Sequence, residues 1–210
     1  MQAGRTWLLI DCAGKCAQAG LHDAQGKIHQ LRHDTMHGYA ILLMPMIAEL
    51  LAEHATTKND LDGIIVTCGP GSFTGLRVSI ACARGLALGL GIPCIGVGSF
   101  ACYAAAIPIK MGARLSVLID TRRGDFFTQS FHAGAAGWQE TGPITILDAD
   151  GLAPALENID IITGDAPLPP FADARPQAHN DLAVIPILSR TAPLAPLPIY
   201  ARPAQTNTAK

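Results

Sequence analysis

One short sequence plan occurs twice in this chain: an apolar run that ends in an aspartate, a tight turn, and a returning segment of alternating character. The first copy reads IDCAGKCAQAGL (10–21) and the second reads IDTRRGDFFTQSF (119–131). Each copy is typical of a buried strand that pairs antiparallel with the strand after it. Two copies within 210 residues predict a duplicated α/β architecture, with two lobes built on mixed sheets flanked by helices.

The hydrophobic pattern predicts further strands and helices in both halves of the chain. We divide the chain into a lobe at 1–109 and a smaller lobe at 110–210. In the first half we expect strands at 6–13, 15–23, 26–34, 60–68 and 92–97, and helices at 38–54, 74–91 and 99–107. The second half is abbreviated: a hairpin at 114–132, a weak strand at 143–147, a short helix near 151–157 and a strand at 159–165. From residue 166 the Pro- and Ala-rich sequence predicts an extended segment docked over the body, with 204–210 disordered.

Two of the expected helices are unusually apolar. The helix at 38–54 carries a stripe that includes Leu43, Met46, Ile47 and Leu50. The helix at 74–91 is apolar almost all round, and only Arg77 and Arg84 interrupt it. A helix of that kind is buried on both sides, so the excess apolar surface indicates a protein partner.

The glycine-rich stretch Gly69, Pro70, Gly71, Ser72, Phe73, Thr74 and Gly75 lies between an expected strand and an expected helix. A helix start of this kind binds anions in some proteins. A P-loop, however, needs a Lys followed by Ser or Thr, and the spacing of a dinucleotide fingerprint is also missing. We therefore favour a structural corner in which glycines supply positive φ and close approach, with Thr74 as the helix N-cap.

Asp11 and Asp120 end equivalent strands and are expected to face one cleft. In a phosphotransferase of this plan such a pair holds a metal and activates water. The adjoining turns, CAGKC and TRRGD, contain one glycine each, and the second offers Arg122 in place of a backbone nest. We interpret Asp11, Asp120 and Arg122 as a degenerate nucleotide cleft. A kinase-like ATPase or a glycoprotease-type peptidase stays open as the alternative.

Metal and nucleic-acid sites are not indicated. His29 and His33 form an HxxxH pair followed by His37, but on a strand the first two lie about 13 Å apart. The six cysteines include no CxxC pair, so we expect free buried thiols and no metal. With 15 basic and 17 acidic residues there is no global basic field to hold a polyanion, so we expect any nucleic-acid contact to be local or made through a partner. The apolar run near the N-terminus is too short for a signal peptide or membrane span, which predicts a cytoplasmic protein.

Five segments, in order, resemble one family. They are IDCAGKCAQAGL (10–21), LLMPMIAELL (42–51), GPGSFTGLRVSIACARGLALGLGIPCIGVGSF (69–100), VLIDTRRGDFF (117–127) and PLPIYARP (196–203). Together they resemble the TsaB (YeaZ) family of bacterial tRNA threonylcarbamoyladenosine biosynthesis proteins, once grouped with glycoproteases. The chain departs from the family pattern at Cys12-Ala13 and at Gly38-Tyr39-Ala40.

This resemblance implies an actin/sugar-kinase-like (ribonuclease H-like) fold and a non-catalytic role. The family member serves threonylcarbamoyl transfer to the adenosine beside the anticodon of tRNAs that read codons beginning with A. It acts as heterodimer partner and activator of the catalytic subunit TsaD, which the ATPase TsaE joins, and it forms a homodimer when alone. The resemblance implies no cofactor of its own, leaves open a nucleotide at the shared interface, and makes contact with tRNA indirect.

The resemblance also places the partner interface on the two apolar helices. The residues that it implies there are Leu43, Met46, Ile47, Leu50, Arg77, Ile80, Arg84 and Ala87.

Overall fold

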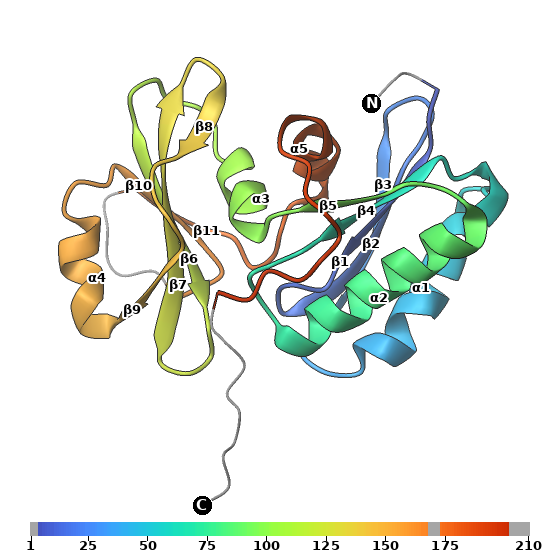
Figure 1. The fold of residues 1–210 in the computed structure, drawn as a ribbon, viewed down its shortest axis with the longest axis horizontal. Helices are drawn as coiled ribbons and strands as arrows, with labels where there is room; N and C mark the ends of the chain where they lie inside the picture. The colour runs from blue at the N-terminus through green and yellow to red at the C-terminus, as the bar shows by residue number, and fades with distance from the viewer. Residues whose placement is uncertain (1–3, 168–172, 202–210) are drawn as a thin grey trace, which may run out of the picture.

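In a computed structural model that describes residues 4–167 and 173–201, the chain forms two α/β lobes side by side (Figure 1). The first sheet has the order β3-β2-β1-β4-β5. Its strands are β1 (Trp7–Asp11), β2 (Cys16–His22), β3 (Ile28–Asp34), β4 (Gly63–Thr67) and β5 (Cys94–Val97). β1, β2 and β3 form an antiparallel meander, whereas β1, β4 and β5 run parallel. The predicted meander is confirmed.

The alternation of side chains along β1 explains why both faces of this sheet are covered. Leu8 and Ile10 lie in the core beneath α1 (Tyr39–Glu53) and α2 (Phe73–Leu90). Trp7 and Leu9 point to the other face, which packs against α5 (Ile185–Thr191) and the short 3₁₀ turn η2 (Leu182–Val184). A strand apolar at every position is required for a sheet buried on both sides.

The second sheet repeats the plan. Its order is β11-β10-β6-β7-β8, and β9 also pairs with β7. The strands are β6 (Arg114–Asp120), β7 (Asp125–Gly134), β8 (Gly137–Glu140), β9 (Thr145–Asp148), β10 (Ile161–Gly164) and β11 (Ala174–Pro176). β6 pairs antiparallel with β7 and parallel with β10, as β1 does with β2 and β4. The duplicated fold is thereby confirmed.

Helices cross between the halves of the sequence. α3 (Ser99–Ala105) packs on the second sheet, while α4 (Ala149–Leu156) covers that sheet's other face. α5, from the C-terminal half, packs on the first sheet. The division at 109/110 stays a prediction, and each lobe takes a helix from across that boundary.

The C-terminal half holds elements that the sequence analysis did not predict. β8, β11, η2 and α5 lie where a loop or an extended tail was expected. The 3₁₀ turn η1 (Lys58–Asp60) was also not predicted, and it overlaps the strand expected at 60–68 only at Asp60. Extended docking does hold for the last described residues, since Leu194 bridges to Gly96 and the Ile199 N–H donates to the Cys68 carbonyl at 2.7 Å. The expectation of disorder at 204–210 lies outside the described residues.

The glycine corner is a place where backbone lies on backbone. A Cβ on Gly75 would lie 2.0 Å from the Cys12 carbonyl oxygen, and one on Gly71 would lie 2.3 Å from that of Ala13. The Ser72 N–H donates to the same Ala13 oxygen at 2.7 Å. The start of α2 therefore docks directly on the β1–β2 turn, at a distance that only glycine permits.

Two details of the expected corner need correction. Gly69 has positive φ (99°), whereas Gly71 and Gly75 are required for close approach alone. The N-cap is Ser72, whose Oγ accepts the Gly75 N–H at 3.2 Å, and Thr74 lies inside the helix.

α2 is the one helix of the described residues that is long and apolar enough to cross a membrane, by length and composition. Its residues Leu76, Ile80, Ala83 and Ala87 are buried against the sheet. A core helix passes the same test.

A pair of glycine substitutions in α2 tests the corner. Gly75→Ala should destabilise the protein by about 1–3 kcal/mol, because the new Cβ would overlap the Cys12 carbonyl oxygen. That oxygen belongs to the backbone and cannot rotate away as a side chain could. Gly85→Ala, in the same helix with nothing within 4 Å of a Cβ, should stabilise it by up to about 1 kcal/mol. Urea denaturation measures both, and equal effects of the two changes would contradict the docking described here.

Candidate functional site

Asp11, expected in the cleft, is fully buried, and both of its carboxylate oxygens accept hydrogen bonds. Its carboxylate accepts hydrogen bonds from the Ala13 N–H (3.0 Å), Gln18 Nε2 (3.0 Å) and Asn180 Nδ2 (3.3 Å), and also from Thr67 Oγ1. These donors lie on the β1–β2 turn, β2, the C-terminal segment and β4. The carboxylate therefore joins four parts of the chain. The expectation that Asp11 faces the cleft is wrong, because its oxygens are used inside the lobe.

A cavity of about 630 Å³ does lie between the lobes. The first lobe contributes Pro70–Thr74 and the second contributes Ile119–Arg123, Phe127 and Asp165. The docked tail closes one side with Ile199–Ala201. Asp120 and Arg122, both predicted, lie in this cavity.

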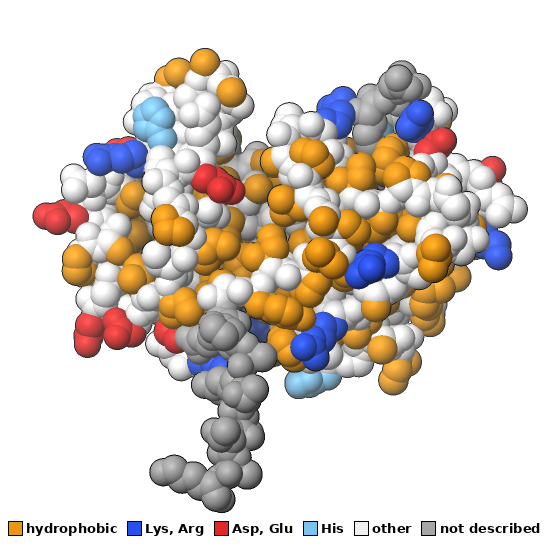
Figure 2. Space-filling model, viewed as in Figure 1, with side chains coloured by type: hydrophobic (Ala, Val, Ile, Leu, Met, Phe, Trp, Pro, Cys, Tyr) orange, Lys and Arg blue, Asp and Glu red, His pale blue; other side chains and the backbone are white. Residues whose placement is uncertain are grey.

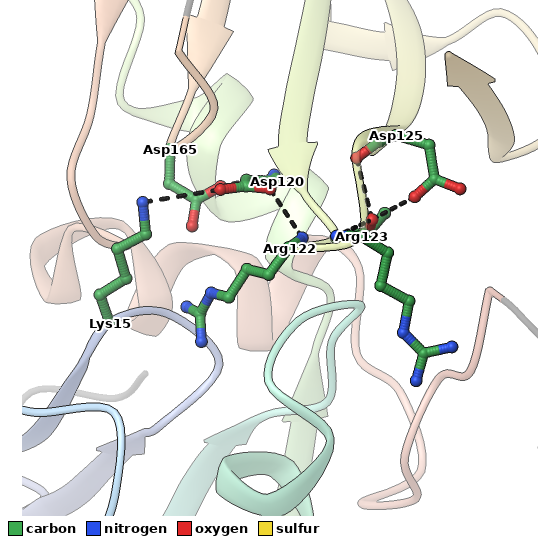
Figure 3. Close-up of polar contacts among 7 residues, drawn as sticks. Lys15, Asp120, Arg122, Arg123, Asp125 and Asp165 are labelled. Atoms are coloured by element: carbon green, nitrogen blue, oxygen red, sulfur yellow. Dashed lines mark hydrogen bonds and ion pairs between the residues drawn. The ribbon is translucent and has the colours of Figure 1, made fainter.

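Asp120 sits in a small network of charges at the cavity wall (Figure 3). Its backbone N–H donates to Asp165 Oδ1 at 2.9 Å, and its own Oδ2 lies 3.8 Å from Lys15 Nζ, which reaches across from the first lobe. Burial raises the pKa of the Asp165 carboxyl, and the N–H of Asp120 together with the charges of Lys15 and Arg122 limits that rise.

The turn at 121–124 has little backbone to offer a phosphate. The Arg122 N–H donates to Asp120 Oδ1 at 2.7 Å, and the Arg123 N–H donates to Thr121 Oγ1 at 3.2 Å. The Thr121 N–H donates to the Asp125 carbonyl at 3.2 Å. A phosphate-wrapping loop needs such N–H groups free and convergent, and here the turn's own acceptors hold them. Within residues 4–167 and 173–201, no group of three potential metal ligands is present.

The predicted interface residues divide into two sets. Leu43, Met46, Ile47, Leu50, Ile80 and Ala87 are at most 7% exposed and lie in the chain's own core. For these six the expectation of an interface surface is wrong, because the first sheet buries that face of each helix. Arg77 and Arg84 are exposed, and their place in an interface stays a prediction.

The outward face of α1 and α2 is also apolar. Ile41 is 78% exposed, Met44 is 48% exposed and Leu88 is 86% exposed. Met44 and Cys82 meet across the two helices, with 3.4 Å between their sulfur atoms. Figure 2 shows hydrophobic side chains over this lobe with few charges among them. α1 and α2 are therefore apolar on both sides: one side of each helix is buried in the core, and the other is exposed to solvent.

A cluster at the mouth of the cavity was not predicted. The Arg77 guanidinium lies 3.8 Å from the centre of the Phe73 ring, and its Nε donates to Tyr200 Oη at 3.1 Å. The rings of Phe73 and Tyr200 are 5.4 Å apart. The cluster joins the glycine corner to the PLPIYARP segment. Both segments belong to the family resemblance, but no local sequence pattern indicates that the glycine corner and PLPIYARP are in contact.

Asp165 allows a test of the cavity wall by pH. Because its folded pKa is raised above the ordinary 3.8, the fold loses stability as pH rises from 3.8 through the raised pKa. Asp165→Asn keeps an acceptor for the Asp120 N–H and removes the buried charge. It should raise Tm at pH 7, with a gap that closes as the pH falls toward 3.8.

Asp173→Asn provides the control of opposite sign. A hydrogen bond from Arg175 holds the pKa of Asp173 below its ordinary value, so this change should lower Tm at pH 7. Thermal melts of both variants between pH 4 and pH 8 give the result. A gap for Asp165→Asn that is independent of pH would contradict the assignment.

Comparison with known proteins agrees with this architecture. The family model described as "TsaD: tRNA N6-adenosine threonylcarbamoyltransferase" matches residues 33–141. A protein of Mycobacterium tuberculosis, described as uncharacterized, is 32% identical over 198 residues, which cover 91% of this chain and 90% of that relative. The Escherichia coli tRNA threonylcarbamoyladenosine biosynthesis protein TsaB is 35% identical over 132 residues, which cover 62% of this chain and 56% of TsaB.

Solved structures give the same fold. YeaZ from Pseudomonas aeruginosa superposes with a TM-score of 0.74 at 22% sequence identity, over 93% of this chain and 99% of that one. The two-lobed architecture, the sequence relatives and the family match agree with one another. This chain belongs to the TsaB/YeaZ family.

Proposed function

We propose that this protein is a non-catalytic subunit in the threonylcarbamoylation of tRNA, and that it binds and activates a TsaD-type threonylcarbamoyltransferase. The E. coli and Haemophilus influenzae relatives are named for tRNA threonylcarbamoyladenosine biosynthesis. The observation that carries the accessory role is the apolar face of α1 and α2, which is turned to solvent. The cleft supports it, because it lacks the parts of a phosphotransferase.

The cleft argues against catalysis through its two aspartates. Asp11 has its hydrogen bonds inside the fold, and in the turn beside Asp120 the N–H groups of Arg122 and Arg123 are bonded to side chains of the same turn. A phosphotransferase of this plan needs two free carboxylates over a metal and a turn that wraps phosphates. Of the two aspartates that end equivalent strands, Asp120 alone lines the cavity, where its carboxylate neighbour is Asp165.

The outward helix face has the composition of an interface. Ile41, Met44 and Leu88 provide large apolar side chains, and Ala48, Ala81 and Gly85 are exposed between them. Small residues allow the backbone of a facing helix to approach closely. An interface of standard size buries about 800 Å² per partner, and two helices of 15 and 18 residues offer a surface of that order.

The same face serves a second copy when the chain is alone and the TsaD-type subunit in the complex, with Arg77 and Arg84 as polar anchors. A TsaE-type ATPase joins the assembled pair. The net charge of −2 leaves tRNA binding mainly to the partner. We place the protein in the cytoplasm, where the tRNA that the complex modifies is.

Depletion of the protein tests this proposal in cells. Mass spectrometry of tRNA nucleosides should show loss of threonylcarbamoyladenosine, restored by the wild-type gene. Unchanged levels of the modified nucleoside would exclude the role. ATP or peptide turnover by the isolated chain would support the enzymatic alternative.

Two substitutions on the outward face separate association from folding. Ile41→Glu and Leu88→Glu place a charge on side chains that are 78% and 86% exposed, so the free energy of unfolding should change by less than about 0.5 kcal/mol. Each should weaken binding of the TsaD-type subunit at least about tenfold, because the charge would be desolvated in the interface.

Ile187→Glu, on α5 and 53% exposed, is the matched control and should bind normally. Binding is measured by surface plasmon resonance and stability by urea denaturation. Wild-type affinity in both helix variants would contradict the proposed interface.

A further inference from the structure

We propose that residues 194–200 form a strap that holds Arg77 in place as the group that binds a carboxylate of the TsaD-type subunit. Docking of the strap and binding of that subunit are then coupled, and Tyr200 is a positioning residue that acts through Arg77. The inference rests on the proposed function, because it takes the outward face of α1 and α2 as the partner surface. It adds to that face a segment from the other end of the chain.

The strap is fixed to the first sheet by its backbone. Leu194 and Gly96 exchange two backbone hydrogen bonds, of 2.8 and 2.9 Å, on β5, which is an edge strand. The Ile199 N–H donates to the Cys68 carbonyl at 2.7 Å, directly after β4. A Cβ on Gly96 would lie 2.6 Å from the Ala195 carbonyl oxygen, so this approach requires glycine. The strap is therefore a docked part of the first lobe (Figure 1).

The strap also borders α2 toward both ends of that helix. Pro196 lines a hollow of about 500 Å³ together with Arg84 and Leu88, in the C-terminal half of α2. Tyr200 reaches Arg77, near the start of α2. Arg77, Arg84 and Leu88 are all exposed, and positions separated by seven and by four residues lie on one side of a helix. The strap therefore lies beside the outward face that we propose as the interface.

Arg77 is held between two aromatic rings. Its guanidinium carbon lies 3.8 Å from the centre of the Phe73 ring and 5.9 Å from that of Tyr200, and its Nε donates to Tyr200 Oη at 3.1 Å. The two ring centres are 5.4 Å apart. An exposed arginine otherwise moves among many rotamers, and the loss of that freedom weakens binding. Because Phe73 and Tyr200 already restrict Arg77, less freedom is lost when a partner binds.

The held guanidinium keeps donors for a partner. Of its five N–H donors, Tyr200 accepts the one on Nε. Among residues 4–167 and 173–201, Arg77 forms no ion pair and its side chain donates no further hydrogen bond. A carboxylate binds two parallel N–H donors of arginine in a bidentate manner. Ala81 and Leu88, exposed on the same side of α2, favour a protein surface as the source of that carboxylate.

A double-mutant cycle tests the coupling. Binding to the TsaD-type subunit is measured by surface plasmon resonance for the wild-type chain, Tyr200→Ala, Arg77→Ala and the double variant. Each single change should weaken binding at least about fivefold. The double variant should bind no more than about twofold more weakly than Arg77→Ala alone, because Tyr200 acts through Arg77. Single effects that multiply in the double variant would show two independent contacts and overturn the proposal.

The salt dependence of binding separates positioning from a purely structural role. Arg77→Ala and Tyr200→Ala should both reduce the fall in affinity between about 0.05 and 0.5 M NaCl, because each removes the same ion pair. Ile146→Ala is the control: it truncates a side chain of similar exposure on the second lobe, 39% against 44% for Tyr200, and should change neither quantity. An unaltered salt dependence in Tyr200→Ala would refute the positioning role.

The variants distinguish failure of the strap from failure of the proposed interface. Normal binding by Ile41→Glu and Leu88→Glu would show that the interface is wrong, and the strap would fall with it. Lost binding in those two variants, together with wild-type affinity in Tyr200→Ala, would refute the strap alone. Urea denaturation checks that each variant is folded. If Tyr200→Ala does not fold, Tyr200→Phe, which loses only Oη, takes its place and should weaken binding in the wild-type chain but not in Arg77→Ala.

Discussion

The structure depends on a contact between two pieces of backbone. The first turn of α2 lies on the carbonyl oxygens of Cys12 and Ala13, at distances that leave no room for a Cβ at Gly71 or Gly75. Because β1 is the central strand of its sheet, this contact fixes α2 relative to the whole first lobe. It also fixes two surfaces at once, since Ser72–Thr74 line the interlobe cavity while the outward side of the same helix meets solvent.

The two copies of the duplicated plan have diverged at their most informative position. Asp11 and Asp120 end equivalent central strands, but one is buried in hydrogen bonds to three neighbouring segments and the other lines a cavity. A carboxylate with all its acceptors occupied stabilises the fold and is unavailable to a ligand. The duplicated architecture therefore persists here without the symmetric pair of aspartates on which phosphoryl transfer would rely.

Much of the fold was predictable from periodicity. The alternation in 16–22 and 28–34 and the apolar runs at 7–11 and 114–120 specify strands, and a pairing pattern follows from the repeat. The burial of Leu50 and Ile80 was not predictable in the same way, because a helix apolar on every side does not reveal which side its own sheet covers. α5 was missed because it lies inside a longer Pro- and Ala-rich stretch, although α5 itself contains one proline and no alanine. Tertiary packing on Leu9 and Ile65 makes the segment helical. The cavity depends on residues more than 50 positions apart, and no local pattern reports such contacts.

The central claim is that the outward face of two helices, and not the cleft, is the surface through which this protein acts in tRNA modification. Hydrogen–deuterium exchange of the chain, alone and with a TsaD-type subunit, tests it most directly. The account predicts that complex formation slows exchange in α1 and α2 and leaves the turn between β6 and β7 unchanged. Slower exchange confined to that turn, with both helices unaffected, would contradict it.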